Sequence, residues 1–121
     1  MTRTQLVGLA GLALAAVTTG CAATPPASVA LPADAVVLDV RTAPEFASGH
    51  LDGAVLLDVS KGDLAAALPL LDPDAPYFVH CRSGSRSAQA VAFMREAGFA
   101  DVTDLGTLES ASAATGLAIE R

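Results

Sequence analysis

Aromatic side chains are scarce in this sequence, which has no Trp, one Tyr and four Phe. Large rings usually supply much of the buried area of a core, so small side chains must fill most of the interior here. The length of 121 residues is close to the usual size of one domain. We therefore expect a single modest core.

Positive charge is also scarce, because seven Lys and Arg stand against thirteen Asp and Glu, for a net charge of −6. That balance argues against nucleic acid as a partner, since a phosphate backbone needs a basic surface. Arg82 and Arg86 nevertheless lie close together in the chain. This local concentration of positive charge on an acidic body predicts an anion site.

Cysteine occurs only twice, and the first copy, Cys21, ends an apolar leader. Arg3 is followed by residues 6–17, which are all apolar or Gly, and this layout is typical of a secretory signal peptide. An uncleaved membrane anchor is the alternative, because the uncharged stretch continues to residue 33.

The pair Gly20-Cys21 resembles the lipobox of bacterial lipoproteins, in which the Cys is lipidated and becomes the mature N-terminus. Plain secretion with cleavage nearby is the alternative. We expect residues 1–20 to be a signal peptide, 21–30 a lipidated Cys21 with a flexible tether, and 31–121 the domain. The expected location is the cell envelope, with a lipid anchor on the outer face of a membrane. Cys81 would then be the only thiol, without a disulfide partner, which suggests a chemical role.

The body of the chain alternates between strand and helix patterns. Residues 36–40 form a β-branched run without polar alternation, which is typical of a strand buried on both faces of a parallel sheet. Weaker runs of this kind cover 54–59, 77–80 and 102–105. The pattern predicts an α/β fold in which helices flank a parallel sheet.

Helices are expected between these runs. Thr42 and Glu45 fit a capping box at the start of one helix, and residues 63–71 and 106–116 suggest two more. Another helix is expected from about Ser87 to Ala97, with a buried face made of Ala88, Val91, Ala92 and the stem of Arg95.

The candidate site is the loop Cys81-Arg82-Ser83-Gly84-Ser85-Arg86, which follows a strand and precedes a helix. Ligand sites of parallel sheets lie at such strand ends. Backbone N–H groups of the small residues, the helix dipole and the two arginines would all favour a Cys81 thiolate, with a lowered pKa and nucleophilic character. The alternatives are that Cys81 is an inert buried residue and that the arginines are surface ion-pair partners.

The run from His80 to Ser87 resembles the active-site loop of rhodanese-like domains, in particular the single-domain thiosulfate sulfurtransferases. A second signature of that family is resembled by Val37-Leu38-Asp39-Val40-Arg41, Glu45-Phe46, Gly49-His50-Leu51 and Gly53-Ala54. The resemblance implies a rhodanese-like domain over residues 31–121, with a five-stranded parallel sheet between helices, and with no metal or cofactor.

The resemblance also implies a double-displacement sulfur transfer. Cys81 would take a sulfane sulfur from a small anionic donor such as thiosulfate, and a thiol or cyanide would collect it from the Cys81 persulfide. The substrate-binding residues would be Arg82, Ser83, Gly84, Ser85 and Arg86. Outside the cytosol, a reducing partner would be needed to protect the reactive thiol from overoxidation.

Five further residues near the site are expected to be structural: Asp39, Arg41, Glu45, His50 and His80. His80 precedes Cys81, but adjacent strand residues point to opposite faces, so it is poorly placed as a base. Glu45 has its capping role, and an Asp-x-Arg sequence at a strand end commonly forms a fixed ion pair.

Two other functions remain open. A cysteine phosphatase or arsenate reductase would use a similar loop, but one residue longer between Cys and Arg than the four residues found here. The other alternative is a rhodanese module that carries or senses sulfur, or binds a protein, without efficient turnover.

Overall fold

The computed structural model describes residues 28–121. The predicted signal peptide and the lipid attachment at Cys21 lie outside this range. Within it, no helix combines the length and the apolar character that crossing a membrane requires.

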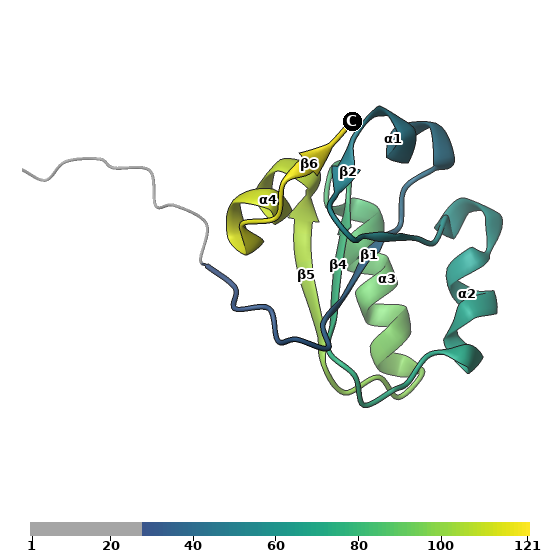
Figure 1. Ribbon diagram of the computed structural model, residues 1–121. Helices are drawn as coiled ribbons and strands as arrows, with labels where there is room; N and C mark the ends of the chain where they lie inside the picture. The colour runs from purple at the N-terminus through teal and green to yellow at the C-terminus, as the bar shows by residue number, and fades with distance from the viewer. Residues whose placement is uncertain (1–27) are drawn as a thin grey trace, which may run out of the picture.

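The main sheet contains four strands, β1 (Val36–Asp39), β3 (Val55–Leu56), β4 (Tyr77–Cys81) and β5 (Val102–Thr107). All pairings in it are parallel, and the strand order is β3-β1-β4-β5. Figure 1 shows β1, β4 and β5 side by side. The α/β prediction is confirmed, but the predicted count of five strands is wrong for the residues that the structure describes. The other two strands, β2 (His50–Leu51) and β6 (Ile119–Glu120), form a separate antiparallel pair.

The run at 54–59 contributes only two strand residues because the chain turns soon after Leu56. Asp58 caps a short 3₁₀ helix, η1 (Val59–Lys61), by accepting a hydrogen bond from the Ser60 backbone N–H at 2.9 Å. A side chain that bonds the local backbone in this way competes with strand pairing.

The first helices follow the sequence signals. α1 (Ala43–Ser48) begins with the predicted capping box, in which the Glu45 backbone N–H donates to Thr42 Oγ1 and the Thr42 N–H donates to Glu45 Oε1. α2 (Asp63–Ala67) passes into a 3₁₀ turn, η2 (Leu68–Leu70), which accommodates the proline of this segment. α4 (Leu108–Thr115) confirms the helix expected at 106–116.

α3 (Ser85–Glu96) starts two residues earlier than predicted. Its buried residues are Ser87, Ala90, Val91 and Met94, whereas Ala88 and Ala92 are exposed. The prediction therefore placed the buried face of α3 at the wrong position around the helix axis. The large Met94 side chain has no exposed surface, and burying it removes more apolar area from water than burying two alanines would.

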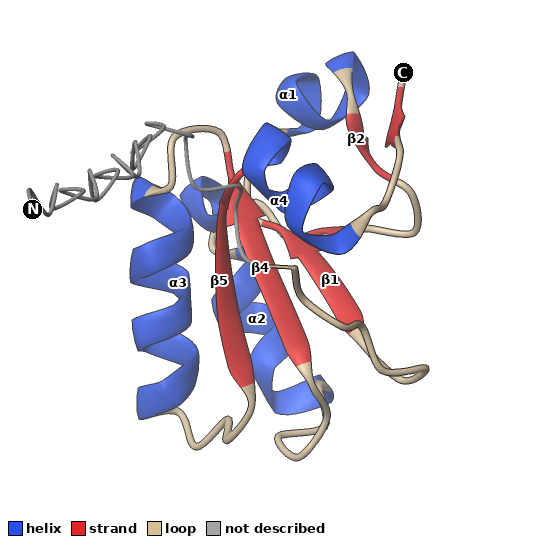
Figure 2. Ribbon diagram, turned by 90° about the vertical axis from the view of Figure 1, so that its left-hand side faces the viewer, coloured by secondary structure: helices blue, strands red, loops and turns tan. Residues whose placement is uncertain are grey.

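The sheet separates two apolar clusters, because successive strand residues point to opposite faces. Leu38, Val79 and Cys81 pack with residues of α2 and α3, whereas Val37 and Phe78 pack with residues of α4 and β2. Figure 2 shows α3 and α4 on opposite sides of the sheet. Each fully buried Val or Leu contributes about 1.5–3 kcal/mol relative to exposure.

Candidate active site

Cys81 is the last residue of β4, where it pairs with Thr107 of β5. The chain then turns at Gly84, whose φ of +91° lies in the region that favours glycine. This turn directs the Gly84 backbone N–H to the Cys81 Sγ at 2.9 Å. The Ser87 Oγ, in the first turn of α3, lies 3.5 Å from the same sulfur. The loop therefore places the Gly84 N–H and the Ser87 hydroxyl at hydrogen-bonding distance from the sulfur.

The Cys81 side chain is completely buried, with 0% of its surface exposed. Burial raises the pKa of the Cys81 thiol. Hydrogen bonds with the Ser87 hydroxyl and with the Ser87, Gly84 and Ser83 backbone lower this pKa by more than burial raises it, so the net pKa is below the usual value. A buried structural cysteine in apolar surroundings would have a raised pKa instead. Cys81 is thus buried, as an inert cysteine would be, but the pKa of its thiol is lowered, as expected for a reactive one.

Arg86 forms a two-pronged ion pair with Glu45, with Nη1 to Oε1 at 2.8 Å and Nη2 to Oε2 at 2.9 Å. Arg86 is the largest cause that holds the pKa of Glu45 at about 2. The pair joins α1 to the start of α3. Because this carboxylate already neutralises Arg86, the contacts of Arg86 fit an ion-pair role better than an anion-binding role. Direct anion binding by Arg86 stays a prediction.

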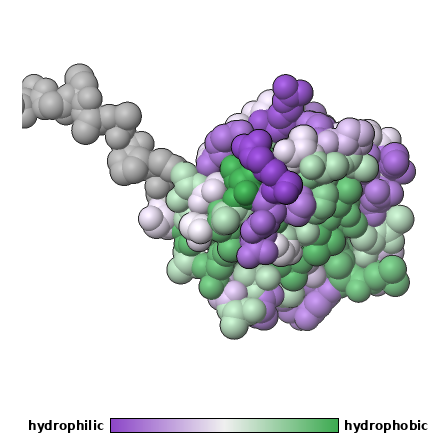
Figure 3. Space-filling view, turned by 45° about the horizontal axis from the view of Figure 1, so that its top comes forward, coloured by the Kyte–Doolittle hydropathy of each residue, from purple (hydrophilic) through white to green (hydrophobic). Residues whose placement is uncertain are grey.

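Arg82 differs from Arg86, because it is exposed and has no ion pair among the residues that the structure describes. Ser83 and Ser85 are exposed as well. Figure 3 shows the molecule with the top of Figure 1 turned toward the viewer. A hydrophilic band crosses this face, with apolar surface on both sides. The loop thus retains one cation that is available to a ligand.

A buried ionic cluster lies on the opposite face of the sheet from the sulfur. Arg41 donates to Asp39 through its backbone N–H, Nε and Nη2, and also from Nη2 to the Gly49 carbonyl. The two side chains are 5% and 0% exposed. This is the fixed pair that the Asp-x-Arg sequence suggested.

His80 is fully buried beside this pair, with Nε2 at 3.7 Å from Asp39 Oδ2. Neither ring nitrogen has a hydrogen-bond partner among the described residues. Burial lowers the pKa of His80, although the charge of Asp39 partly opposes this effect. His50 instead stacks on Phe46 and places Nδ1 at 2.9 Å from the Phe46 carbonyl. Both histidines are placed to pack rather than to contact the Cys81 sulfur.

Two contacts at the site were not predicted from the sequence. The Ser87 hydroxyl was not among the predicted site residues, although a hydroxyl side chain in the first turn after a cysteine loop is a usable signal. The Glu45–Arg86 pair spans 41 positions, and no local pattern indicates it. In residues 28–121, no group of three or more His, Cys, Asp or Glu side chains could hold a metal ion.

The comparisons with known proteins agree with this geometry. Residues 28–107 match the rhodanese-like domain family, and the chain therefore belongs to that family. It is 39% identical over 71 residues to the thiosulfate sulfurtransferase GlpE of Pseudomonas fluorescens. This aligned stretch covers 59% of this chain and 63% of the relative.

Solved structures show the same fold. A Rhodanese_3-like domain from Anabaena superposes with a TM-score of 0.61 and 28% identity, covering 71% of this chain and 98% of the other. A structure described as rhodanese with anions, from E. coli, has a TM-score of 0.54 and 28% identity, covering 63% of this chain and 89% of the other.

Proposed function

We propose that this protein is a sulfurtransferase that moves a sulfane sulfur from thiosulfate or a persulfide donor through Cys81 to a thiol or cyanide. The observation that carries the proposal is the Cys81 sulfur, which the Gly84 N–H and the Ser87 hydroxyl surround so that its pKa falls despite complete burial. Membership of the rhodanese-like family and the likeness to GlpE proteins support it.

The first half-reaction begins from the Cys81 thiolate, the form that the lowered pKa of this residue favours. The Cys81 thiolate attacks the outer sulfur of thiosulfate, the bond between the two sulfurs of the donor breaks, and its electron pair leaves with sulfite. Arg82 is the cation available to attract the donor and the leaving group. The E. coli rhodanese described with anions is consistent with such attraction.

The persulfide that remains carries its negative charge on the terminal sulfur. Backbone N–H groups that hold the thiolate, those of Ser83, Gly84 and Ser87, are in place to stabilise this charge too. Arg86 is tied to Glu45, and we assign it mainly to holding the loop against α1. The predicted binding roles of Ser83 and Gly84 are thus assigned to their backbone N–H groups, and binding by Ser85 stays a prediction.

Two measurements test the proposal together. Thiosulfate:cyanide turnover is followed while the intact mass of the protein is recorded before and after addition of thiosulfate. We expect turnover, a gain in mass of one sulfur atom, and loss of both in Cys81→Ser. Hydrolysis of a phosphate ester without sulfur uptake would overturn the assignment in favour of a phosphatase, although the four-residue spacing to Arg86 argues against that outcome.

A second candidate, a sulfur carrier or sensor, is favoured by the burial of Cys81. With no exposed surface on this residue, a donor reaches the sulfur only after neighbouring groups of the loop move, and such a step slows each transfer. A persulfide that forms on Cys81 once, but does not turn over with cyanide or with thiols, would identify the carrier.

We also propose export and anchoring through Cys21, on the strength of the apolar leader and the Gly20-Cys21 pair. A partner that reduces oxidised Cys81 would then be required in the envelope. The intact mass of the mature protein from a bacterial host tests the anchor. We expect the mass of a lipidated chain that begins at Cys21, and Cys21→Ser should abolish it; an unprocessed chain would refute export.

A further inference from the structure

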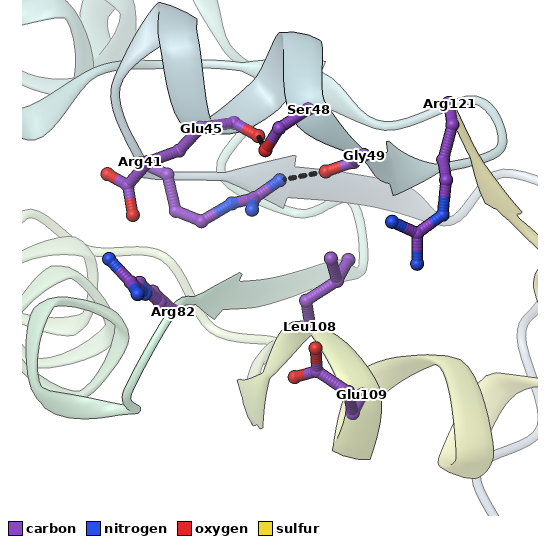
Figure 4. Close-up of a pocket in the computed structure, with 8 residues that line it drawn as sticks. All are labelled: Arg41, Glu45, Ser48, Gly49, Arg82, Leu108, Glu109 and Arg121. Atoms are coloured by element: carbon purple, nitrogen blue, oxygen red, sulfur yellow. Dashed lines mark hydrogen bonds between the residues drawn. The ribbon is translucent and has the colours of Figure 1, made fainter.

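A polar pocket of about 310 Å³ lies where β4 and β5 end (Figure 4). Arg82 and Leu108, which line it, directly follow the paired residues Cys81 and Thr107. The pocket therefore borders the start of the loop that follows Cys81, although Cys81 itself is not in its lining. The full lining comprises Arg41, Glu45, Ser48, Gly49, Arg82, Leu108, Glu109 and Arg121.

One wall of the pocket is a buried and oriented guanidinium. Nε and Nη2 of Arg41 are used by Asp39 and the Gly49 carbonyl, and the side chain is only 5% exposed. Nη1 makes no hydrogen bond within the described part of the chain, and Figure 4 shows this third nitrogen on the side of Leu108. A donor held in this way can bind an anionic group with little loss of side-chain entropy.

Two further cations face the pocket from its ends, and one acid lies on its floor. The β2–β6 pair brings Arg121 to the pocket. The Arg121 Cγ lies close to Gly49, 3.7 Å from the position that a Cβ would occupy there. Arg82 lies at the opposite end (Figure 4). Glu109 of α4 and both arginines have no ion pair among residues 28–121, whereas Glu45 is already neutralised by Arg86.

The pocket thus offers unpaired charges of both signs at the carboxyl ends of β4 and β5, one residue along the chain from Cys81. Resting on the sulfur transfer proposed above, we propose that it binds the acceptor, a small thiol that carries both a carboxylate and an ammonium group. Arg41 Nη1 and Arg121 hold the carboxylate, and Glu109 holds the ammonium group. This division leaves Arg82 to the anionic donor.

The transfer to this acceptor is balanced without any further reactant. The acceptor thiol gives its proton to water, and its thiolate attacks the terminal sulfur of the Cys81 persulfide. A sulfur–sulfur bond forms to the acceptor while the bond to Cys81 breaks, and the electron pair of the broken bond returns to Sγ as a thiolate.

Four thiols test the proposal through the KM for discharge of the preformed persulfide. L-cysteine carries both charged groups, 3-mercaptopropionate only the carboxylate, cysteamine only the ammonium group, and 2-mercaptoethanol neither. Arg121→Gln should raise KM about threefold to tenfold for the two carboxylate thiols and not for cysteamine. Glu109→Gln should raise KM for L-cysteine and cysteamine by a similar factor, and should not raise KM for 3-mercaptopropionate. Lys61→Gln, which removes a positive charge outside the pocket lining, is the matched control.

Equal changes for all four thiols, or no change in either variant, would overturn the acceptor pocket. The proposed function is tested separately, by persulfide loading from thiosulfate and discharge by cyanide, which carries neither group. Binding of S-methyl-L-cysteine to Cys81→Ser, followed by NMR, needs no sulfur chemistry. It should weaken in the double variant with Arg121→Gln; undiminished binding there would count against the pocket even if sulfur loading failed.

Discussion

Cys81 and His80 are neighbours on β4, both completely buried, yet their side chains lie on opposite faces in opposite electrostatic conditions. The Cys81 sulfur has the Gly84 N–H and the Ser87 hydroxyl, which favour its charged form. His80 has no hydrogen-bond partner among the described residues, and burial favours its neutral form. Both pKa values are lowered, but for different reasons: hydrogen bonding favours a thiolate on one face, and desolvation favours a neutral ring on the other.

The ionic support on the His80 face should give the largest effect. Asp39→Ala leaves the buried Arg41 guanidinium without its carboxylate, so we expect a loss of about 3–5 kcal/mol in the free energy of unfolding. Urea denaturation measures this loss. Asp52→Ala, at an exposed aspartate, is the control and should cost less than about 0.5 kcal/mol. Similar losses in the two variants would mean that the buried pair is not a special support.

The second prediction concerns the pH dependence of stability. The pKa of His80 is lowered from the ordinary 6.5 in the folded protein, so the unfolded chain takes up a proton first as the pH falls. Stability should therefore decrease below about pH 6.5, with a slope of up to about 1.4 kcal/mol per pH unit. Denaturation between pH 7.5 and 5.5 checks this. His80→Leu should flatten the profile, and a profile that stays steep would place the titrating group elsewhere.

The third prediction concerns the Cys81 face. Ser87→Ala removes a hydrogen bond to the sulfur and should raise the pKa of Cys81, because burial then meets less opposition. Alkylation by a small reagent at pH 7 should slow about threefold to tenfold. The pH profile of alkylation identifies the cause: a shifted midpoint supports the hydrogen bond, and an unshifted one would leave Ser87 with a packing role only. Thr103→Ala removes a hydroxyl from β5 and serves as the control.

The smallest effect is expected at the pair that holds the loop against α1. The pKa of Glu45 is lowered from 4.5 to about 2, so its contribution is present above pH 4.5 and is lost as the pH falls toward 2. Because both side chains are partly exposed, Glu45→Gln should cost only about 0.5–1 kcal/mol at pH 7. Denaturation curves of the two proteins should converge near pH 2, and a constant gap would contradict an ionic origin.

Much of the fold could be predicted because its signals are local. The apolar run at 36–40 specified a buried parallel strand, and the capping box of Thr42 and Glu45 specified the start of α1. Prediction failed where long-range contacts decide. The β2–β6 pair depends on residues about seventy positions apart, and the rotation of α3 depends on which side chains the sheet can bury.

The candidate site divides in the same way. The sequence by itself determined that a cysteine ends a buried strand, that small residues follow it, and that a helix begins directly afterwards, because these features depend on short-range backbone preferences. Only the tertiary structure decided that the sulfur is fully buried, that Arg86 is occupied by Glu45, and that Arg121 reaches the pocket. These outcomes depend on how distant segments pack and share charge, which no local pattern encodes.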